Sequence, residues 1–355
     1  MKESYAPKGV LFWFSKISEV FEFMKKVLIT STGSVAADIT IKSLKRMGFK
    51  IIGCNMFPKE WVAESCEVDV FYKLPPVSDA EKYFLALKEI CVKEEIDFLF
   101  PMIDYEIDLL NENREWFAEN NIILCISPKK SIDIIRNKKL FQDFVAKECP
   151  FIKSIPTVFL KDIEHLEWEF PVVCKPYNGR SSQGLTYIYN KQQWDEFVSV
   201  ADKNKYIVEP FIDGPLVMVE VVRQSNPEKV VAMTRREILS TPNGCSLTVH
   251  VFQDKILEEN TKALAIKLDI LGDVNFEYIL DPSGVYHLVE CNPRFSAGCE
   301  FACIGGYDCI ENHIKCFQGK VIEDYHFKHN MIIARKYEEV LTAIDVDVEY
   351  FNTIH

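Results

Sequence analysis

The sequence predicts a mixed α/β and α+β chain of three units: a Rossmann-like parallel sheet, a small α+β unit and a mainly antiparallel sheet. Between residues 24 and 128, short apolar strands alternate with helices, the pattern of a doubly wound parallel sheet. After Pro150 the strands become short and closely spaced. From residue 214 on they are longer and are separated by turn residues, as antiparallel strands are.

The first unit, at 24–128, consists of strand–loop–helix repeats. The loop at 31–34 has one glycine where a dinucleotide-binding fingerprint has three, and no acidic residue closes the second strand, so NAD is not the expected ligand. Residues 1–23 are expected to be an N-terminal extension with no part in the chemistry. The expected elements are strands at 27–30, 50–54, 97–101 and 122–126 and helices ending near 47 and spanning 79–94 and 105–119.

A central linking helix at 129–149 leads to the other two units. The second unit, at 150–213, is expected to hold strands at 157–160, 171–176, 185–189 and 206–210 and a helix at 191–201. The third, at 214–355, is expected to hold strands at 216–224 and 229–236, a helix at 254–269, a hairpin, helices at 299–304 and 308–318 and a strand at 331–340.

Composition excludes several classes of function. The chain has 53 acidic and 41 basic residues, and the resulting net charge of −12 argues against nucleic acid or an anionic membrane as a partner. No apolar run is long enough to span a membrane. The twelve cysteines include no CxxC pair and no zinc-site spacing, so we expect reduced thiols in a cytoplasmic protein.

The segment 274–295 carries the most specific chemistry. Residues 281–284, Asp-Pro-Ser-Gly, have the composition of a tight turn between two β-branched and aromatic runs, which predicts a hairpin. Side chains alternate faces along a strand, and we expect Glu277, Glu290 and Asn292 to share one face. Two carboxylates and an amide oxygen are hard ligands that suit Mg²⁺. The alternative is a solvated hairpin face.

The register of this hairpin follows if residues 281–284 form the whole turn and the strands pair without a bulge. Glu277 then faces Leu288, and Asn275 faces Glu290. In that register Glu277 and Glu290 are diagonal neighbours that can converge on a small cation, and Asn275 steadies the Glu290 carboxylate.

A second motif joins a buried lysine to a loop of small residues. Lys175 lies at the end of the apolar strand 171–176, and residues 177–184 follow with two glycines and two serines. The N–H groups and hydroxyls of such a loop can surround phosphate oxygens, and the lysine adds a positive charge. The lysine precedes the glycines, so this is not a P-loop. Taken alone, the loop is also typical of an ordinary turn.

A carboxylate, Glu209, interrupts the apolar strand at 206–212. It can accept from an adenine amino group, and an edge-strand glutamate without function is the alternative. The order of lysine, glycine-rich loop, hinge glutamate and then Glu…Glu-x-Asn-x-Arg resembles the ATP-grasp superfamily over about residues 24–319. Within it the chain is most similar to the carbamoyl-phosphate-synthase-like branch of carboxylate–amine ligases. The most specific element is Glu290-Cys291-Asn292-Pro293-Arg294.

The resemblance implies the ATP-grasp fold, with ATP and Mg²⁺ (or Mn²⁺) as cofactors, and it implies a role for each matching residue. The implied ATP-binding residues are Lys138, Lys175, Gly179, Ser181, Ser182, Gly184, Glu209, Phe211 and Ile212. The implied metal ligands are Glu277, Glu290 and Asn292, and the implied catalytic residues are Lys175 and Arg294, of which Arg294 steadies an acyl phosphate. Leu216 stands where many relatives have a ribose-binding glutamate, which departs from the family pattern.

The implied activity is that of an ATP-dependent, ADP-forming carboxylate–amine ligase with small-molecule substrates. Phosphorylation turns a carboxylate into an electrophile, and the enzyme supplies alignment and charge neutralisation. The alternatives are phosphorylation of a carboxylate in a carbamoyl-phosphate-type assembly and a nucleotide-binding regulator without turnover. Asp104 and Glu106, beyond a strand's carboxyl end, and Arg236 are the candidate residues for substrate recognition. A homodimer is compatible with the sequence.

Overall fold

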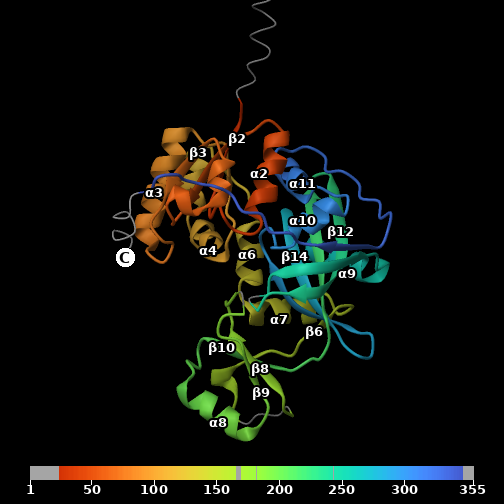
Figure 1. Cartoon of the computed structure of the whole chain (residues 1–355). Helices are drawn as coiled ribbons and strands as arrows, with labels where there is room; N and C mark the ends of the chain where they lie inside the picture. The colour runs from red at the N-terminus through yellow and green to blue at the C-terminus, as the bar shows by residue number, and fades with distance from the viewer. Residues whose placement is uncertain (1–23, 165–168, 181, 243, 347–355) are drawn as a thin grey trace, which may run out of the picture.

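The computed structural model describes residues 24–164, 169–180, 182–242 and 244–346. The expected extension at 1–23 and the candidate residue Ser181 lie outside these residues. Three sheets form, as the sequence predicts: a parallel sheet and a large antiparallel sheet lie beside each other, and a small sheet extends from them (Figure 1). Within the described part of the chain, no helix is long and apolar enough to cross a bilayer.

The parallel sheet confirms the Rossmann-like first unit. Its strand order is β3-β2-β1-β4-β5, and every pair is parallel. Val27, Leu28 and Ile29 of β1 are all fully buried because helices cover both faces of the sheet. The strands are β1 (Lys26–Ile29), β2 (Lys50–Asn55), β3 (Val70–Lys73), β4 (Phe98–Phe100) and β5 (Ile123–Leu124), and the helices are α2 (Ala37–Arg46), α3 (Ala80–Glu94), α4 (Asp104–Glu112) and α5 (Arg114–Glu119). The strand β3 was not predicted.

The linking helix predicted at 129–149 is two helices, α6 (Lys129–Ile135) and α7 (Lys138–Glu148). The break falls at Arg136 and Asn137. Asn137 has extended backbone angles, and its side chain accepts from the backbone N–H of Leu140, so it starts a new helix instead of continuing the old one. This break places Lys138 at the first turn of α7.

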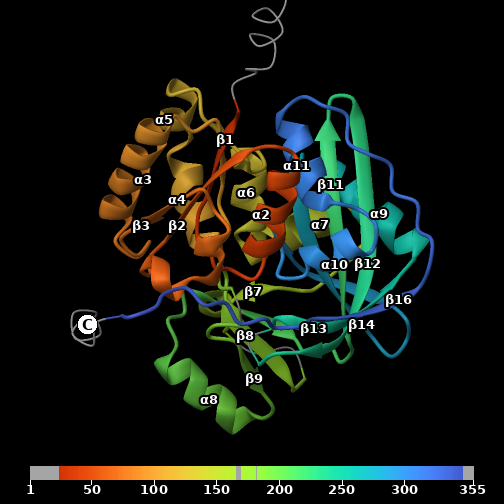
Figure 2. The same ribbon diagram turned by 45° about the horizontal axis from the view of Figure 1, so that its top comes forward.

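The small sheet has the order β7-β10-β8-β9 and is antiparallel throughout. One helix, α8 (Lys191–Val200), covers it, with Trp194 in the shared core (Figure 2). Its core is a single small cluster, so this unit holds few buried side chains of its own. The strands are β7 (Val158–Phe159), β8 (Val172–Pro176), β9 (Thr186–Ile188) and β10 (Tyr206–Pro210).

The large sheet has the order β16-β13-β12-β11-β14-β15-β6 and is antiparallel except for the β15–β6 pair. Two of its strands, β6 and β13, were not predicted, and β6 comes from the range 150–213 assigned to the small unit. The domain boundaries themselves stay a prediction. The strands are β6 (Lys153–Ser154), β11 (Leu216–Ser225), β12 (Glu228–Ser240), β13 (Ser246–Phe252), β14 (Gly272–Leu280), β15 (Tyr286–Asn292) and β16 (Met331–Ala334), and the helices are α9 (Lys255–Lys267), α10 (Cys299–Ile304) and α11 (Cys309–Phe317).

The β14–β15 hairpin has a different register from the predicted one. Glu277 pairs with Glu290, and Tyr278, not Glu277, pairs with Leu288. The turn includes one more residue, since Asp281 bonds Val285 across it, and a bulge falls between Glu277 and Tyr278. The two one-residue shifts add up, so the two glutamates are direct partners and not diagonal neighbours.

Candidate active-site cleft

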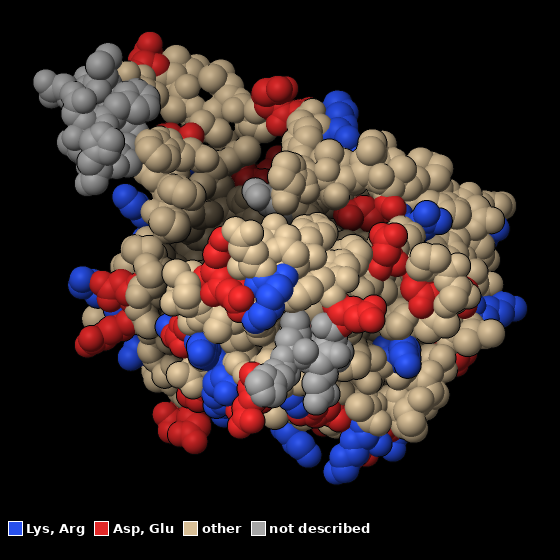
Figure 3. Space-filling model, turned by 90° about the horizontal axis from the view of Figure 1, so that it is seen from below, with Lys and Arg blue, Asp and Glu red and all other residues tan. Residues whose placement is uncertain are grey.

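A cleft lies where the small sheet faces the β14–β15 hairpin and the start of α7. Seen from below, the surface is hollowed beside the small sheet (Figure 3). Most of the predicted nucleotide and metal residues line this one cleft: Lys138, Lys175, Gly179, Ser182, Glu209, Phe211, Ile212, Glu277 and Glu290. Side chains from three separate parts of the sequence therefore meet at a single concave site, as ligand sites do.

The Lys175 ammonium is buried in the cleft and forms an ion pair with Glu209. Its Nζ lies 2.7 Å from Glu209 Oε2, and Thr157 donates to the other oxygen of Glu209 at 3.0 Å. Burial lowers the pKa of Lys175, but the charges of Glu209, Glu290 and Glu277 raise it by more, so the lysine stays charged. The pair arises because β8 and β10 are antiparallel neighbours: Lys175 pairs with Ile207, two residues before Glu209, so the two side chains are diagonal neighbours on one face.

Lys138 joins the loop of the small unit to the hairpin. Its Nζ lies 2.9 Å from Glu290 Oε2 and donates to the carbonyl of Gly179 at 2.8 Å. The Glu290 carboxylate therefore has a lysine as its ion-pair partner. Burial raises the pKa of Glu290, and the charges of Lys138 and Lys175 lower it by more.

Glu277, Glu290 and Asn292 share one face of the hairpin, as predicted. Asn292 Nδ2 donates to Glu277 Oε1 at 2.8 Å. Burial, and after it the nearby charge of Glu290, raises the pKa of Glu277 above its ordinary value. Asn275 does not steady Glu290: it faces Asn292 and donates instead to Glu220 Oε2 at 3.1 Å.

The side chains present fit a hard divalent cation. Two carboxylates from paired strands repel each other here, and an amide is bonded to one of them, which is the oxygen-rich donor set that Mg²⁺ takes. Among the described residues, no three His, Cys, Asp or Glu side chains gather into a metal-binding group. A cation at Glu277 and Glu290 would therefore share its coordination with Asn292 and with phosphate oxygens of a bound nucleotide.

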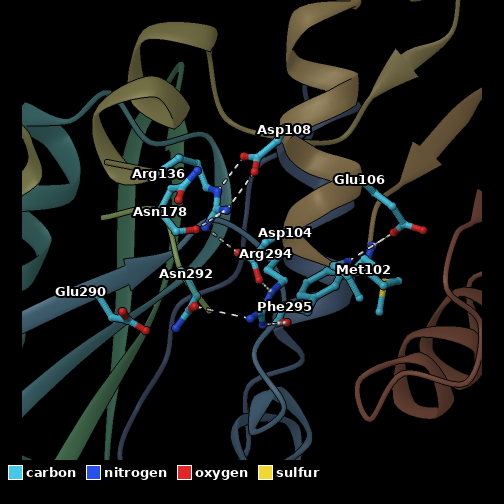
Figure 4. A network of polar contacts seen from close by, with 12 residues as sticks. Met102, Asp104, Glu106, Asp108, Arg136, Asn178, Glu290, Asn292, Arg294 and Phe295 are labelled. Atoms are coloured by element: carbon cyan, nitrogen blue, oxygen red, sulfur yellow. Dashed lines mark hydrogen bonds and ion pairs between the residues drawn. The ribbon is translucent and has the colours of Figure 1, made fainter. Parts of the chain in front are cut away.

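Arg294 follows the hairpin and reaches the N-terminal unit. Its Nε donates to Asp104 Oδ2 at 3.0 Å, and Asp104 Oδ1 lies 3.2 Å from Nη1 of Arg136 (Figure 4). Arg136 also forms a two-bonded pair with Asp108 and donates to the carbonyl of Asn178. This chain of charges connects α4, the α6–α7 junction, the loop after β8 and the end of β15.

None of the three residues predicted to recognise substrate, Asp104, Glu106 and Arg236, is among the residues that line the cleft. Glu106 points away from Arg294 and lies buried among its own donors, including Thr30, Ser31 and Tyr83, so it anchors the start of α4 (Figure 4). Burial raises the pKa of Glu106 despite these bonds. Arg236 is exposed and pairs with Val217 of β11. Its side chain is therefore on the face of the sheet opposite to Glu277, which pairs with Met218.

The residue that the sequence reasoning missed is the neighbour of Arg236, Arg235. In the sheet, Arg235 pairs with Met218, and Met218 pairs with Glu277, so Arg235 lies in the row that ends at the two glutamates. It is buried and donates to Glu220 Oε2 at 2.6 Å. Its charge acts to lower the pKa of Glu277. Strand alternation offered this signal, but only the register tells which of the two arginines faces inward.

The loop after β8 surrounds the mouth of the cleft. Gly184, unlike Gly179 and Ser182, is not among the lining residues; its φ of +74° and its contact with Pro176 mark it as the turn residue of the loop. Arg180 lies over the ring of Tyr105 on α4, and burial lowers the pKa of Arg180 to about 10. Leu216, where a ribose-binding glutamate was noted as missing, does line the cleft.

Comparison with known families gives two matches at different parts of the chain. Residues 27–125 match the PylC-like N-terminal domain, and residues 202–340 match the model "ATP-grasp in the biosynthetic pathway with Ter operon". Among characterised proteins, the chain is 26% identical over 311 residues to the N-terminal section of the carbamoyl phosphate synthase large chain of Aquifex aeolicus. That match covers 77% of this chain and 54% of the relative, so the chain spans about half of the relative's length.

Solved structures share the fold at low sequence identity. Biotin carboxylase from Campylobacter jejuni superposes with a TM-score of 0.70 at 19% identity, covering 84% of this chain and 72% of the other. L-amino acid ligase from Bacillus licheniformis superposes with a TM-score of 0.63 at 17% identity, covering 81% and 72%. The chain has three sheets in this order, with a lysine-bearing loop and a carboxylate hairpin around one cleft, and its residues 202–340 are similar to an ATP-grasp family.

Proposed function

We propose that this chain is an ATP-dependent, ADP-forming ligase that joins a carboxylate to an amine through an acyl phosphate. The observation that carries the proposal is the cleft, in which two lysines and three carboxylates from three parts of the chain converge. The printed names of its relatives, a carbamoyl phosphate synthase section, a biotin carboxylase and an amino acid ligase, agree with such chemistry.

Each group in the cleft has a part in this reaction. Lys175 and Lys138 would hold the phosphates, with the backbone N–H groups of the loop after β8 around them. Glu277, Glu290 and Asn292 would hold Mg²⁺, which neutralises phosphate charge when it is bound.

The adenine would lie against the strand β10 and the residues after it. Phe211 and Ile212 line that part of the cleft and offer backbone groups to the ring edge. Glu209 lies on β10 itself, and its bonds to Lys175 and Thr157 fix its position there. Leu216 gives the sugar an apolar contact in place of a hydrogen-bonding one.

Arg294 acts on the phosphoryl group being transferred. It follows two proposed metal ligands directly, and its guanidinium is bonded to Asn292 and Asp104, outside the part of the cleft that Phe211 and Ile212 line. A guanidinium held at this end would stabilise negative charge that develops on the phosphoryl group and on the acyl phosphate. Closure of the loop after β8 would exclude water, since an acyl phosphate is easily hydrolysed.

The test is ADP formation by the wild type and by Arg294→Ala across a panel of carboxylates, including bicarbonate, with ammonia, amino acids and amino sugars as amines. We expect Arg294→Ala to bind Mg-ATP within a few-fold of wild type and to lose roughly 10²-fold in turnover, the order expected for one preorganised donor. The control is Arg46→Ala, an arginine paired with Asp308 far from the cleft. If the wild type binds Mg-ATP and forms no ADP with any pair, the chain is a nucleotide-binding regulator and the ligase proposal is wrong.

A further inference from the structure

Asp104 is a buried carboxylate of the N-terminal unit that bonds to Arg294, which follows the last strand residue of the β14–β15 hairpin in the large sheet. It is 2% exposed, and each of its oxygens contacts an arginine: Oδ2 accepts from Arg294 and Oδ1 from Arg136. Burial raises the pKa of Asp104, and the charges of Arg294 and Arg136 lower it by more, so it stays ionised. Both oxygens of Asp104 are therefore bonded to arginine side chains.

We propose that Asp104 is a positioning residue that holds the Arg294 guanidinium at the metal end of the cleft. The proposal rests on the proposed ligase function, in which Arg294 meets the transferred phosphoryl group. It assigns to an aspartate of the N-terminal unit, 190 positions before Arg294, a part in the phosphoryl transfer carried out by the rest of the chain.

The other contacts of Arg294 are too weak to fix its orientation. Its Nη2 lies 3.4 Å from Asn292 Oδ1, and its Nη1 lies 3.2 Å from the carbonyl of Phe295. Neither acceptor carries a charge, whereas the contact to Asp104 is a charge-assisted bond at 3.0 Å with a nearly buried carboxylate. An arginine side chain has many rotamers, and a charge-assisted contact at Nε restricts them.

The fold provides an internal comparison for this contact. Asp108 lies one turn after Asp104 on α4, and both carboxylates bond to Arg136 (Figure 4). Asp108 holds Arg136 with two bonds, at 2.7 and 2.9 Å, but has no bond to Arg294. A change at Asp108 therefore disturbs the link from α4 to the loop after β8 and leaves the Arg294 contact in place.

The experiment compares Asp104→Asn with Asp108→Asn in the full chain. We expect Asp104→Asn to lower kcat about tenfold or more, part of the loss from removing the arginine itself, with KM for ATP within about threefold of wild type. Asp108→Asn is expected to keep both constants within about threefold. Equal losses in the two variants would mean that both aspartates only fasten the units together, which would overturn the proposal.

A double variant separates positioning from other roles. In an Arg294→Ala background, Asp104→Asn should change kcat by less than about twofold, because Asp104 has nothing left to position. A further tenfold loss would show that Asp104 acts on its own and would overturn the proposal. Asp104→Glu, which keeps the charge on a longer side chain, serves if Asp104→Asn does not fold, and it should retain more turnover than Asp104→Ser.

A measurement without turnover keeps the inference distinct from the proposed function. The measurement is an NMR spectrum of protein labelled with ¹⁵N-arginine. The Nε–H proton of Arg294 should be protected from solvent exchange in wild type and in Asp108→Asn, and it should exchange freely in Asp104→Asn. Unchanged protection in Asp104→Asn would overturn the positioning contact even in an active enzyme. If the wild type forms no ADP but protection is lost only in Asp104→Asn, the contact is retained and the ligase function is rejected.

Discussion

At the scale of single residues, the hairpin glutamates are the part of the site that the sequence predicts best. Their residue types and spacing indicate a shared face, and the pairing of Glu277 with Glu290 confirms it. The lysine partner of Glu290 could not be predicted, because Lys138 meets it only after α7 and the hairpin have packed. Strand alternation predicts that Arg235 and Arg236 lie on opposite faces of the sheet, but only the register of β12 shows that Arg235 is the one on the face of Glu277.

His313 is a buried residue whose protonation links folding to pH. Its ring packs among Phe100, Phe295 and Phe317, and its Nδ1 accepts the backbone N–H of Asp273 at 2.7 Å. Burial lowers the pKa of His313 from 6.5 to about 3. Protonation of an imidazole ring that has no access to water is unfavourable, so His313 is neutral in the folded chain.

We predict that acidification destabilises the chain through this histidine. Between about pH 6.5 and pH 3 the unfolded chain binds a proton at His313 and the folded chain does not, so the free energy of unfolding falls as the pH falls, by up to roughly 1.4 kcal/mol per pH unit. His313→Gln should show a shallower dependence between pH 6.5 and 5 in denaturant melts. His329→Gln, at an exposed position, is the control and should follow the wild type. Equal slopes in wild type and His313→Gln would contradict the assignment.

At the scale of elements, the hairpin owes its function to an irregularity. Leu288 and Cys291 pack in the core, while the two residues between them, Val289 and Glu290, both line the cleft. A regular strand would turn one of these two toward the core, and the bulge at Glu277 removes that conflict. Alternation patterns cannot reveal a bulge, because the apolar residue that it adds fits either face. The sequence therefore predicts the hairpin and its shared face but not its register.

The entry of β11 into the sheet depends on Gly214. Its φ is +151°, and a Cβ at this position would overlap the carbonyl of Leu280 on the neighbouring strand β14. Only glycine lets the two strands approach each other here, just before Leu216 enters the cleft.

We therefore expect Gly214→Ala to lower the free energy of unfolding by more than about 2 kcal/mol and to weaken Mg-ATP binding, because β11 must move away from β14. The matched variant is Gly244→Ala, also at positive φ but with nothing within 4 Å of an added Cβ. It should cost about 1 kcal/mol, the conformational penalty alone. Thermal melts and calorimetric titrations of both variants decide the matter, and equal losses in the two would show that crowding at Leu280 is irrelevant.

At the scale of the whole molecule, three units contribute to one site, and no single unit contains it. The parallel sheet provides Asp104, the small sheet Lys175, and the large sheet Glu290 and Arg294. The sequence predicts the three sheets because their element patterns differ. It could not predict the contacts between them, since pairs such as Asp104 and Arg294 join residues far apart in the chain and have no local signal.

A nucleotide that binds between the small and large sheets should restrain the loop after β8, which contains a trypsin site at Arg180. We predict that Mg-ATP slows tryptic cleavage there in the wild type and has little effect in Lys175→Ala, whose affinity for ATP should fall because phosphate loses a buried partner. Lys205→Ala removes an exposed lysine of the same unit, paired with Asp202, and should keep the protection. Unchanged ATP affinity in Lys175→Ala, measured by calorimetry, would remove this lysine from the nucleotide site.

The ion pairs of the cleft also have a consequence for the order of events. Lys138 and Lys175 each already hold a glutamate, so the site is close to electrically neutral before anything enters. For triphosphate alone to bind, both lysines would have to exchange their counterions and leave Glu209 and Glu290 as bare, half-enclosed anions, which is costly. Nucleotide and divalent cation are therefore expected to bind together, because the cation offsets part of the triphosphate charge. The lysines would then move from the glutamates to phosphate as Glu290 moves from lysine to metal. Binding is then an exchange of ion partners, and ATP alone or the divalent cation alone should bind far more weakly than the two together.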